Sequence, residues 1–101
     1  MRAFMAAAPV GDEQLREDPS VNELQDLVAD LTGKEAALFL PSGTMCNVIA
    51  FAVHCGRGET VILHEDAHPN IAEQGQAAVI GNVLVRPVKG ERGIFGVDEV
   101  L

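Results

Sequence analysis

The stretch AALFLPSGTMCNVIAFAVHCGRGETVIL, residues 36–63, decides the fold expected for this chain. Its apolar run over 36–40 is bounded by Pro41, an apolar segment of helical length follows over 45–55, and a second short apolar run covers 60–63. Short apolar runs between turn signals are typical of strands buried on both faces of a sheet. We therefore predict a strand, a helix and a second strand.

The sequence before this stretch predicts two helices joined by a loop. Residues 2–8 are good helix formers, whereas 9–19 contain two prolines and a glycine and read as a loop. Ser20 and Glu23 match a capping box, in which each side chain bonds a backbone N–H at the start of a helix. Gly33 is expected to end that helix.

The sequence after this stretch continues the alternation of helices and strands. Residues 69–79 are expected to be helical at least in part, 82–86 to form a third strand, and 97–101 to begin a helix that the chain does not finish. Alternating strands and helices predict an α/β domain with a parallel sheet. The unfinished last helix favours a piece of a longer chain.

Composition and charge exclude several kinds of protein. The formal net charge is −8 and no basic stripe occurs, so nucleic acid is not expected as a partner. No apolar run approaches the length that spans a membrane, and no signal peptide is recognisable. Cys46 and Cys55 lie in an apolar, helix-like stretch, so we expect reduced, buried thiols in a cytoplasmic protein.

The segment PSGT, residues 41–44, joins a predicted strand to a predicted helix. Ser42, Gly43 and Thr44 would place free backbone N–H groups and two hydroxyls at the helix start, an arrangement that suits a phosphate group. Gly43 would let the backbone approach a ligand closely. Local pattern alone also fits an ordinary turn with an N-cap.

The segment HEDAH, residues 64–68, raises the question of a metal site. His64 continues a strand and Pro69 disfavours helical geometry at His68, so the two rings need not converge. The order of residues also differs from His-Glu-x-x-His, and we therefore predict no metal site.

The side chains of this segment have simpler interpretations. His64 is expected at the end of the strand, and Glu65 and Asp66 as solvated residues or as a helix cap. His68 alone reads as a loop histidine or a helix cap, and Glu73 as a surface residue that alternatively supports the site. Both PSGT and HEDAH follow strands, and ligands of parallel α/β sheets bind beyond the carboxyl ends of strands. We therefore treat the two segments as one candidate site.

Several motifs taken together resemble the threonine aldolase family. They are VGD at 10–12, the EDPS, V, N and L positions from Glu17 onwards, GKEAALF with PSGTM and N, and DAH at 66–68. The combination is far more specific than any one piece, and the resemblance covers nearly the whole chain. Members of this family are lyases of fold type I that depend on pyridoxal 5'-phosphate.

The resemblance implies a fold and an organisation. It implies a partial three-layer α/β/α domain with a parallel sheet, the N-terminal part of the large domain of fold type I. Residues 1–101 would form a single partial domain, with N-terminal helices and loop over 1–34 and the start of the cofactor-binding α/β domain over 35–101.

The resemblance also implies a role for each matched residue. Ser42, Gly43 and Thr44 would hold the cofactor phosphate. His68 would lie against the face of the pyridine ring and assist removal of a proton from the substrate hydroxyl. The lysine that binds the cofactor has no match here, because Lys34 and Lys89 lie at other positions.

The implied activity is cleavage of a threonine-like β-hydroxy-α-amino acid to glycine and an aldehyde. The implied assembly is a homodimer or homotetramer of a longer chain, and these residues alone are expected to be inactive. Two alternatives stay open: another enzyme of fold type I, and a non-catalytic fragment that binds a partner chain or a phosphate ligand.

Overall fold

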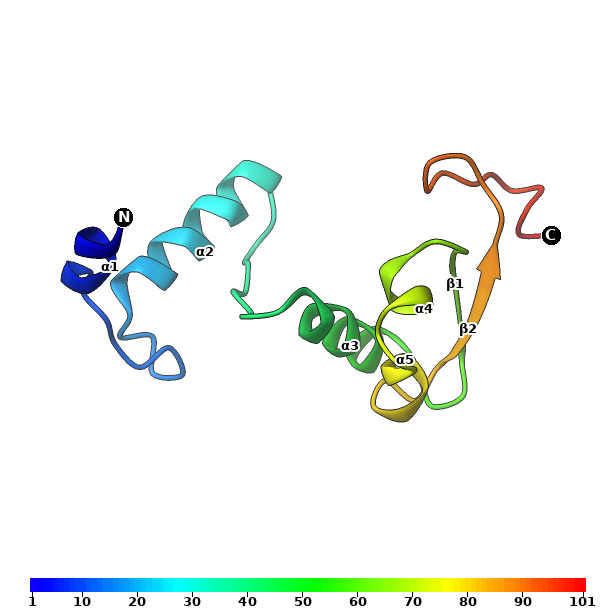
Figure 1. Cartoon of the computed structure of the whole chain (residues 1–101), viewed down its shortest axis with the longest axis horizontal. Coiled ribbons are helices and arrows are strands. Elements are labelled where there is room, and N and C mark those ends of the chain that lie inside the picture. The colour runs from blue at the N-terminus through cyan, green and yellow to red at the C-terminus, as the bar shows by residue number, and fades with distance from the viewer. The chain divides into compact units, whose positions relative to one another are not determined.

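The structure, a computed structural model, describes all 101 residues as two compact units (Figure 1). The first unit comprises Met1–Phe39 and the second Leu40–Leu101. No helix in either unit combines the length and apolar character needed to cross a membrane.

The first unit consists of two helices, α1 (Arg2–Ala7) and α2 (Pro19–Thr32). The prediction that Ser20 caps α2 is wrong, because the cap is Asp18, whose Oδ1 accepts a hydrogen bond from the N–H of Val21 at 3.0 Å. Proline is favoured in the first turn of a helix, since its missing N–H would be unpaired there in any case. The predicted end is confirmed: Gly33 caps α2 in the left-handed conformation, with φ 63°.

The strand predicted over 36–40 is not formed. These residues are extended but belong to no sheet, and most of them are exposed. An extended segment becomes a strand only when a neighbour satisfies its backbone groups, and no other segment of the chain pairs with this one. The N–H of Phe39 instead donates to the side-chain Oε1 of Gln25 at 2.9 Å.

The second unit is a mixed α/β structure with a two-stranded parallel sheet, which confirms the predicted class and strand direction (Figure 1). Its elements in order are α3 (Gly43–His54), β1 (Thr60–His64), α4 (His68–Ile71), α5 (Gln76–Val79) and β2 (Leu84–Val88). Thr60 is paired with Leu84 and His64 with Val88, so both strands end at the same edge of the sheet. The three-layer arrangement implied by the resemblance stays a prediction.

Local backbone geometry explains where the second unit departs from expectation. The single helical segment predicted over 69–79 is divided, because Gln74 and Gly75 both have positive φ, at 54° and 76°. β2 lies two residues further along than predicted. The last residues form a turn, with the N–H of Leu101 donating to the carbonyl of Val97, and no helix.

The core of the second unit is small and lies where α3, α5 and the sheet meet. Val48, Ala77, Val83 and Val88 are its buried apolar residues. A side chain at Gly81 would come 2.7 Å from the carbonyl oxygen of Ala77, so glycine is required for this close approach. Both strands are only partly buried, in contrast to the prediction that they are buried on both faces. Through these contacts α5 joins α3 to the sheet.

Candidate functional site

The first part of the site is the start of α3. Ser42 is the N-cap, and the first bond within the helix runs from the N–H of Cys46 to the carbonyl of Ser42, at 3.1 Å. The N–H groups of Gly43 and Thr44 therefore have no helical partner. The Oγ of Ser42 lies 3.5 Å from the backbone nitrogen of Met45, a long hydrogen bond. A helix of 12 residues thus begins with donors and a positive dipole end, which together favour an anion.

Open space lies beside Gly43. A Cβ added to this residue would meet no atom within 4 Å, and its φ is not positive. The fold itself therefore does not require glycine here. A Cβ would instead fill part of the hollow in front of the helix start.

The second part of the site is His68, the first residue of α4. It follows the end of β1 by four residues, and 63% of its side chain is exposed. Its Nδ1 lies 2.8 Å from Oε1 of Glu73. Because an ionised carboxylate can only accept a hydrogen bond, Nδ1 is the donor and Nε2 is left without a proton in the neutral ring.

One pocket connects the two parts. Its volume is about 510 Å³, and it is lined by Ser42, Gly43, Thr44, Cys46, Asn47 and His68. The four residues singled out in the sequence therefore lie around the same hollow. Their proposed roles in cofactor binding and proton transfer remain predictions.

Glu73 and Asn47 form a buried support for His68. Glu73 is 2% exposed, so its prediction as a surface residue is wrong. Its Oε1 accepts a hydrogen bond from Nδ2 of Asn47 at 2.6 Å, in addition to the one from His68. Burial alone would raise the pKa of Glu73, but the hydrogen bonds from His68 and Asn47 and the charge interaction with His68 hold that pKa below its ordinary value of 4.5.

Asn47 is part of the motif that resembles the family, but no role was predicted for it from the sequence. The signal available was a single amide in the otherwise apolar segment from Met45 to Val53. A polar residue among apolar ones on a helix needs a hydrogen-bond partner if it faces the interior. Glu73, one of two polar residues in the short segment after α4, is that partner.

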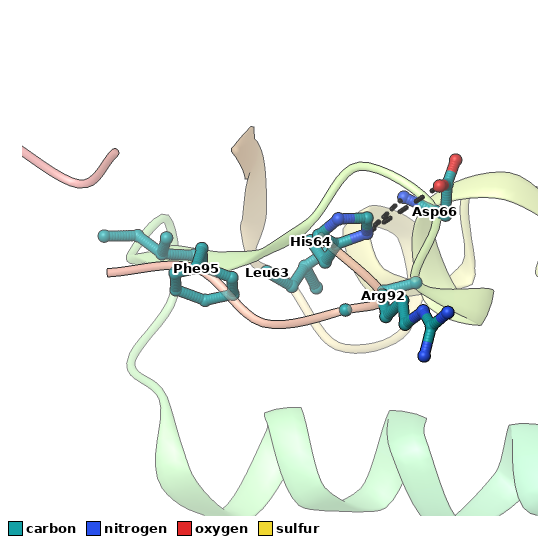
Figure 2. Close-up of a pocket in the computed structure, with 8 residues that line it drawn as sticks. Leu63, His64, Asp66, Arg92 and Phe95 are labelled. Atoms are coloured by element: carbon teal, nitrogen blue, oxygen red, sulfur yellow. Dashed lines mark hydrogen bonds and ion pairs between the residues drawn. The ribbon is translucent and has the colours of Figure 1, made fainter. Parts of the chain in front are cut away.

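His64 belongs to a different environment, as Figure 2 shows. It is the last residue of β1, as predicted, and is 7% exposed. Its Nδ1 accepts a hydrogen bond from the backbone N–H of Asp66 at 3.1 Å, and the ring is turned towards that residue. It lines a separate pocket of about 530 Å³ with Arg92 and Phe95.

The two histidines therefore have separate hydrogen-bond partners and do not face a common site. Nδ1 of His64 bonds the backbone of Asp66, whereas Nδ1 of His68 bonds Glu73. No group of three or more histidine, cysteine, aspartate or glutamate side chains is arranged to hold a metal ion.

Two further expectations about polar side chains need correction. Cys46 is exposed, not buried, because it lies on the side of α3 that faces the pocket, and Cys55 is half-buried. Glu65 and Asp66 are both exposed, as one interpretation had it, but neither caps α4, which begins without a side-chain cap.

The donors of this pocket suit the phosphate group of a ligand such as pyridoxal 5'-phosphate. The hollow beside Gly43 has the free N–H groups of the helix start on one side and an exposed imidazole on the other. No lysine or arginine lines it, so an anion would be held by neutral donors and the helix dipole.

Comparisons with known proteins identify relatives over the whole chain. It is 51% identical over 101 residues to the "Low specificity L-threonine aldolase" of Escherichia coli (strain K12), a match that covers 99% of this chain and 30% of that relative. It is 49% identical over 92 residues to the "Probable low-specificity L-threonine aldolase 2" of Arabidopsis thaliana, covering 90% and 26% respectively. The "Probable low-specificity L-threonine aldolase" of Schizosaccharomyces pombe is 35% identical over 96 residues.

The chain spans about 30% of the length of the first of these relatives. The family model described as "Beta-eliminating lyase" matches residues 1–101. With a match over its whole length, the chain belongs to the beta-eliminating lyase family.

Proposed function

We propose that the full-length protein containing these residues is a pyridoxal-phosphate-dependent lyase. It cleaves a threonine-like β-hydroxy-α-amino acid to glycine and an aldehyde. The observation that carries this proposal is that one pocket is lined both by the start of α3 and by His68. The backbone N–H groups at that helix start have no helical partner, and the exposed ring of His68 is hydrogen-bonded to a carboxylate. The named relatives are threonine aldolases, and their family depends on this cofactor.

The start of α3 supplies the binding site for the cofactor phosphate. The N–H groups of Gly43 and Thr44 donate to its oxygens, and the hydroxyls of Ser42 and Thr44 add two further donors. The space beside Gly43 accommodates the close approach. Because no basic side chain lines this pocket, the dipole of α3 carries most of the charge complementarity from these residues.

His68 serves as the aromatic neighbour of the cofactor ring and as a proton acceptor. Its Nε2 carries no proton when Nδ1 donates to Glu73. Nε2 then takes the proton of the substrate β-hydroxyl, directly or through one water, while the bond between Cα and Cβ breaks. The cofactor, when bound, withdraws the electrons left on Cα.

The experiment is turnover of threonine by the full-length protein with and without pyridoxal phosphate. We expect glycine and acetaldehyde in equal amounts, dependent on the cofactor. Serine serves as the comparison substrate, because β-elimination would release ammonia and an oxo acid from it. If serine released ammonia and an oxo acid while threonine released no glycine, the protein would be a β-eliminating enzyme. That result would refute this proposal.

Other parts of the proposal concern the whole protein. We infer a cytoplasmic homodimer or homotetramer in which residues 35–101 begin the cofactor-binding domain and 1–34 contribute helices and a loop. Apolar side chains along α2, such as Leu27 and Leu31, are exposed to solvent in this chain. Their exposure supports the proposal that α2 packs against further protein. Light scattering of the purified full-length protein tests the assembly, and a monomer would contradict it.

A further inference from the structure

We propose that Glu73 is a positioning residue that sets the tautomer of His68 and so keeps Nε2 free to accept a proton. The inference rests on the proposed function, because that function gives Nε2 its role. It assigns to Glu73 a purpose that the pocket residues alone do not reveal, since Glu73 does not line the pocket.

A short hydrogen bond joins Glu73 to His68. Oε1 of Glu73 and Nδ1 of His68 are 2.8 Å apart, a distance typical of a hydrogen bond to a charged group. A carboxylate offers only acceptors, so the proton is on Nδ1. A neutral imidazole carries one proton, and Nε2 therefore has a free lone pair on the opposite edge of a ring that lines the pocket.

Burial and a second hydrogen bond hold Glu73 in place. Its side chain has no exposed surface, and Asn47 donates to the same Oε1 at 2.6 Å. Asn47 belongs to α3, the helix whose start forms the other side of the pocket. The chain from Asn47 to Glu73 to His68 therefore ties the orientation of the imidazole to the helix that holds the anion site.

The second carboxylate oxygen of Glu73 makes this arrangement costly. Oε2 of Glu73 is buried and has no hydrogen-bond partner. A buried carboxylate with one unpaired oxygen is unfavourable unless its other bonds are strong. Because both donors converge on Oε1, the ionised form is retained by His68 and Asn47 together.

A purely structural ion pair is the rival explanation. It would fix α4 against α3 without favouring one ring nitrogen for the reaction. The two explanations differ in the tautomer of His68 and in the kinetic constant that a change at Glu73 affects. Stability alone does not separate them.

The experiment is nitrogen NMR of the full-length protein labelled with ¹⁵N-histidine, recorded at about pH 8, where an ordinary histidine is neutral. Signals of His68 and His64 are assigned by loss in His68→Asn and His64→Asn. We expect a protonated Nδ1 and an unprotonated Nε2 at His68, with and without pyridoxal phosphate. A proton on Nε2 in the unaltered protein would overturn the proposal without any variant.

The variant Glu73→Gln provides a second test, because its side-chain amide can donate a hydrogen bond to Nδ1 of His68 as well as accept one from it. We expect the proton of His68 to move at least partly to Nε2, while the signals of His64 stay unchanged. We also expect kcat for threonine to fall about 10- to 100-fold with KM changed less than about 2-fold, and Glu73→Asp to recover part of the loss.

These measurements separate two kinds of failure. An unchanged tautomer or an unchanged kcat in Glu73→Gln would overturn the role of Glu73 while threonine cleavage stands. The expected tautomer in a protein that does not cleave threonine would leave the positioning intact and refute the proposed function alone.

Discussion

Replacement of Gly43 by alanine separates ligand binding from folding at the proposed phosphate site. The added Cβ meets no atom within 4 Å and the backbone conformation is open to alanine, so the fold tolerates the change. Exchange of glycine for alanine at a compatible position stabilises a protein by about 0.4–1 kcal/mol. The same Cβ enters the hollow at the start of α3, where it would crowd a bound phosphate.

Crowding of this kind costs about 1–3 kcal/mol. At 1.4 kcal/mol for each factor of ten, binding of pyridoxal phosphate by Gly43→Ala weakens about 5- to 150-fold. Absorbance titration of the full-length protein measures the Kd, and thermal unfolding without cofactor measures stability. A matched control is Ala50→Gly, on an exposed part of α3, which should lower stability and leave the Kd unchanged. Unaltered cofactor affinity in Gly43→Ala would refute the assignment of the phosphate to this helix start.

Three further predictions address the histidines, the buried carboxylate and the helix cap. His68→Asn should lower kcat about 100-fold or more, whereas His64→Asn should have a smaller effect, because only His68 lines the pocket; equal losses would contradict the division of roles. The pKa of Glu73 lies below 4.5, so its contribution to stability is complete above that pH and is lost as pH falls through the lowered value. The difference in Tm between the unaltered protein and Glu73→Gln should therefore become smaller below pH 4.5. A difference that stays constant down to about pH 3 would contradict this stabilising role of the ionised Glu73. Asp18→Ala should lower Tm more than Ser20→Ala, since Asp18 accepts hydrogen bonds from the N–H groups of Val21 and Gly11; the reverse order would restore Ser20 as the cap.

Local signals in the sequence predicted several elements well. The helices α1, α2 and α3 and the strand β1 follow from helix formers, Gly33 and apolar runs between turn residues. The direction of the strands follows from the alternation of elements. These features depend on residues near one another in the chain.

Features that depend on distant partners were predicted less well. The run over 36–40 has the composition of a strand, but no other segment supplies the backbone partners that a strand needs. Asp18 and Ser20 are both good caps, and the choice between them depends on where Pro19 enters the helix.

The residues of the candidate site also fall into two groups, those found from local sequence and those that depend on distant contacts. Ser42, Gly43 and Thr44 stand out because they join an apolar run to a helix, whereas His68 gained its predicted role from the family resemblance. The structure brings all four residues to one pocket. The pairing of Asn47 with Glu73 was missed, since the two residues are 26 positions apart and nothing local in the sequence indicates that they meet. Glu73 is buried where it meets Asn47 of α3, a contact that the sequence around Glu73 does not reveal.

A crystal structure of the full-length protein with pyridoxal phosphate tests the central claim most directly. The account predicts phosphate oxygens within hydrogen-bond distance of the N–H groups of Gly43 and Thr44, and the imidazole of His68 against the face of the cofactor ring. A phosphate bound elsewhere, or a cofactor ring with no contact to His68, would contradict it.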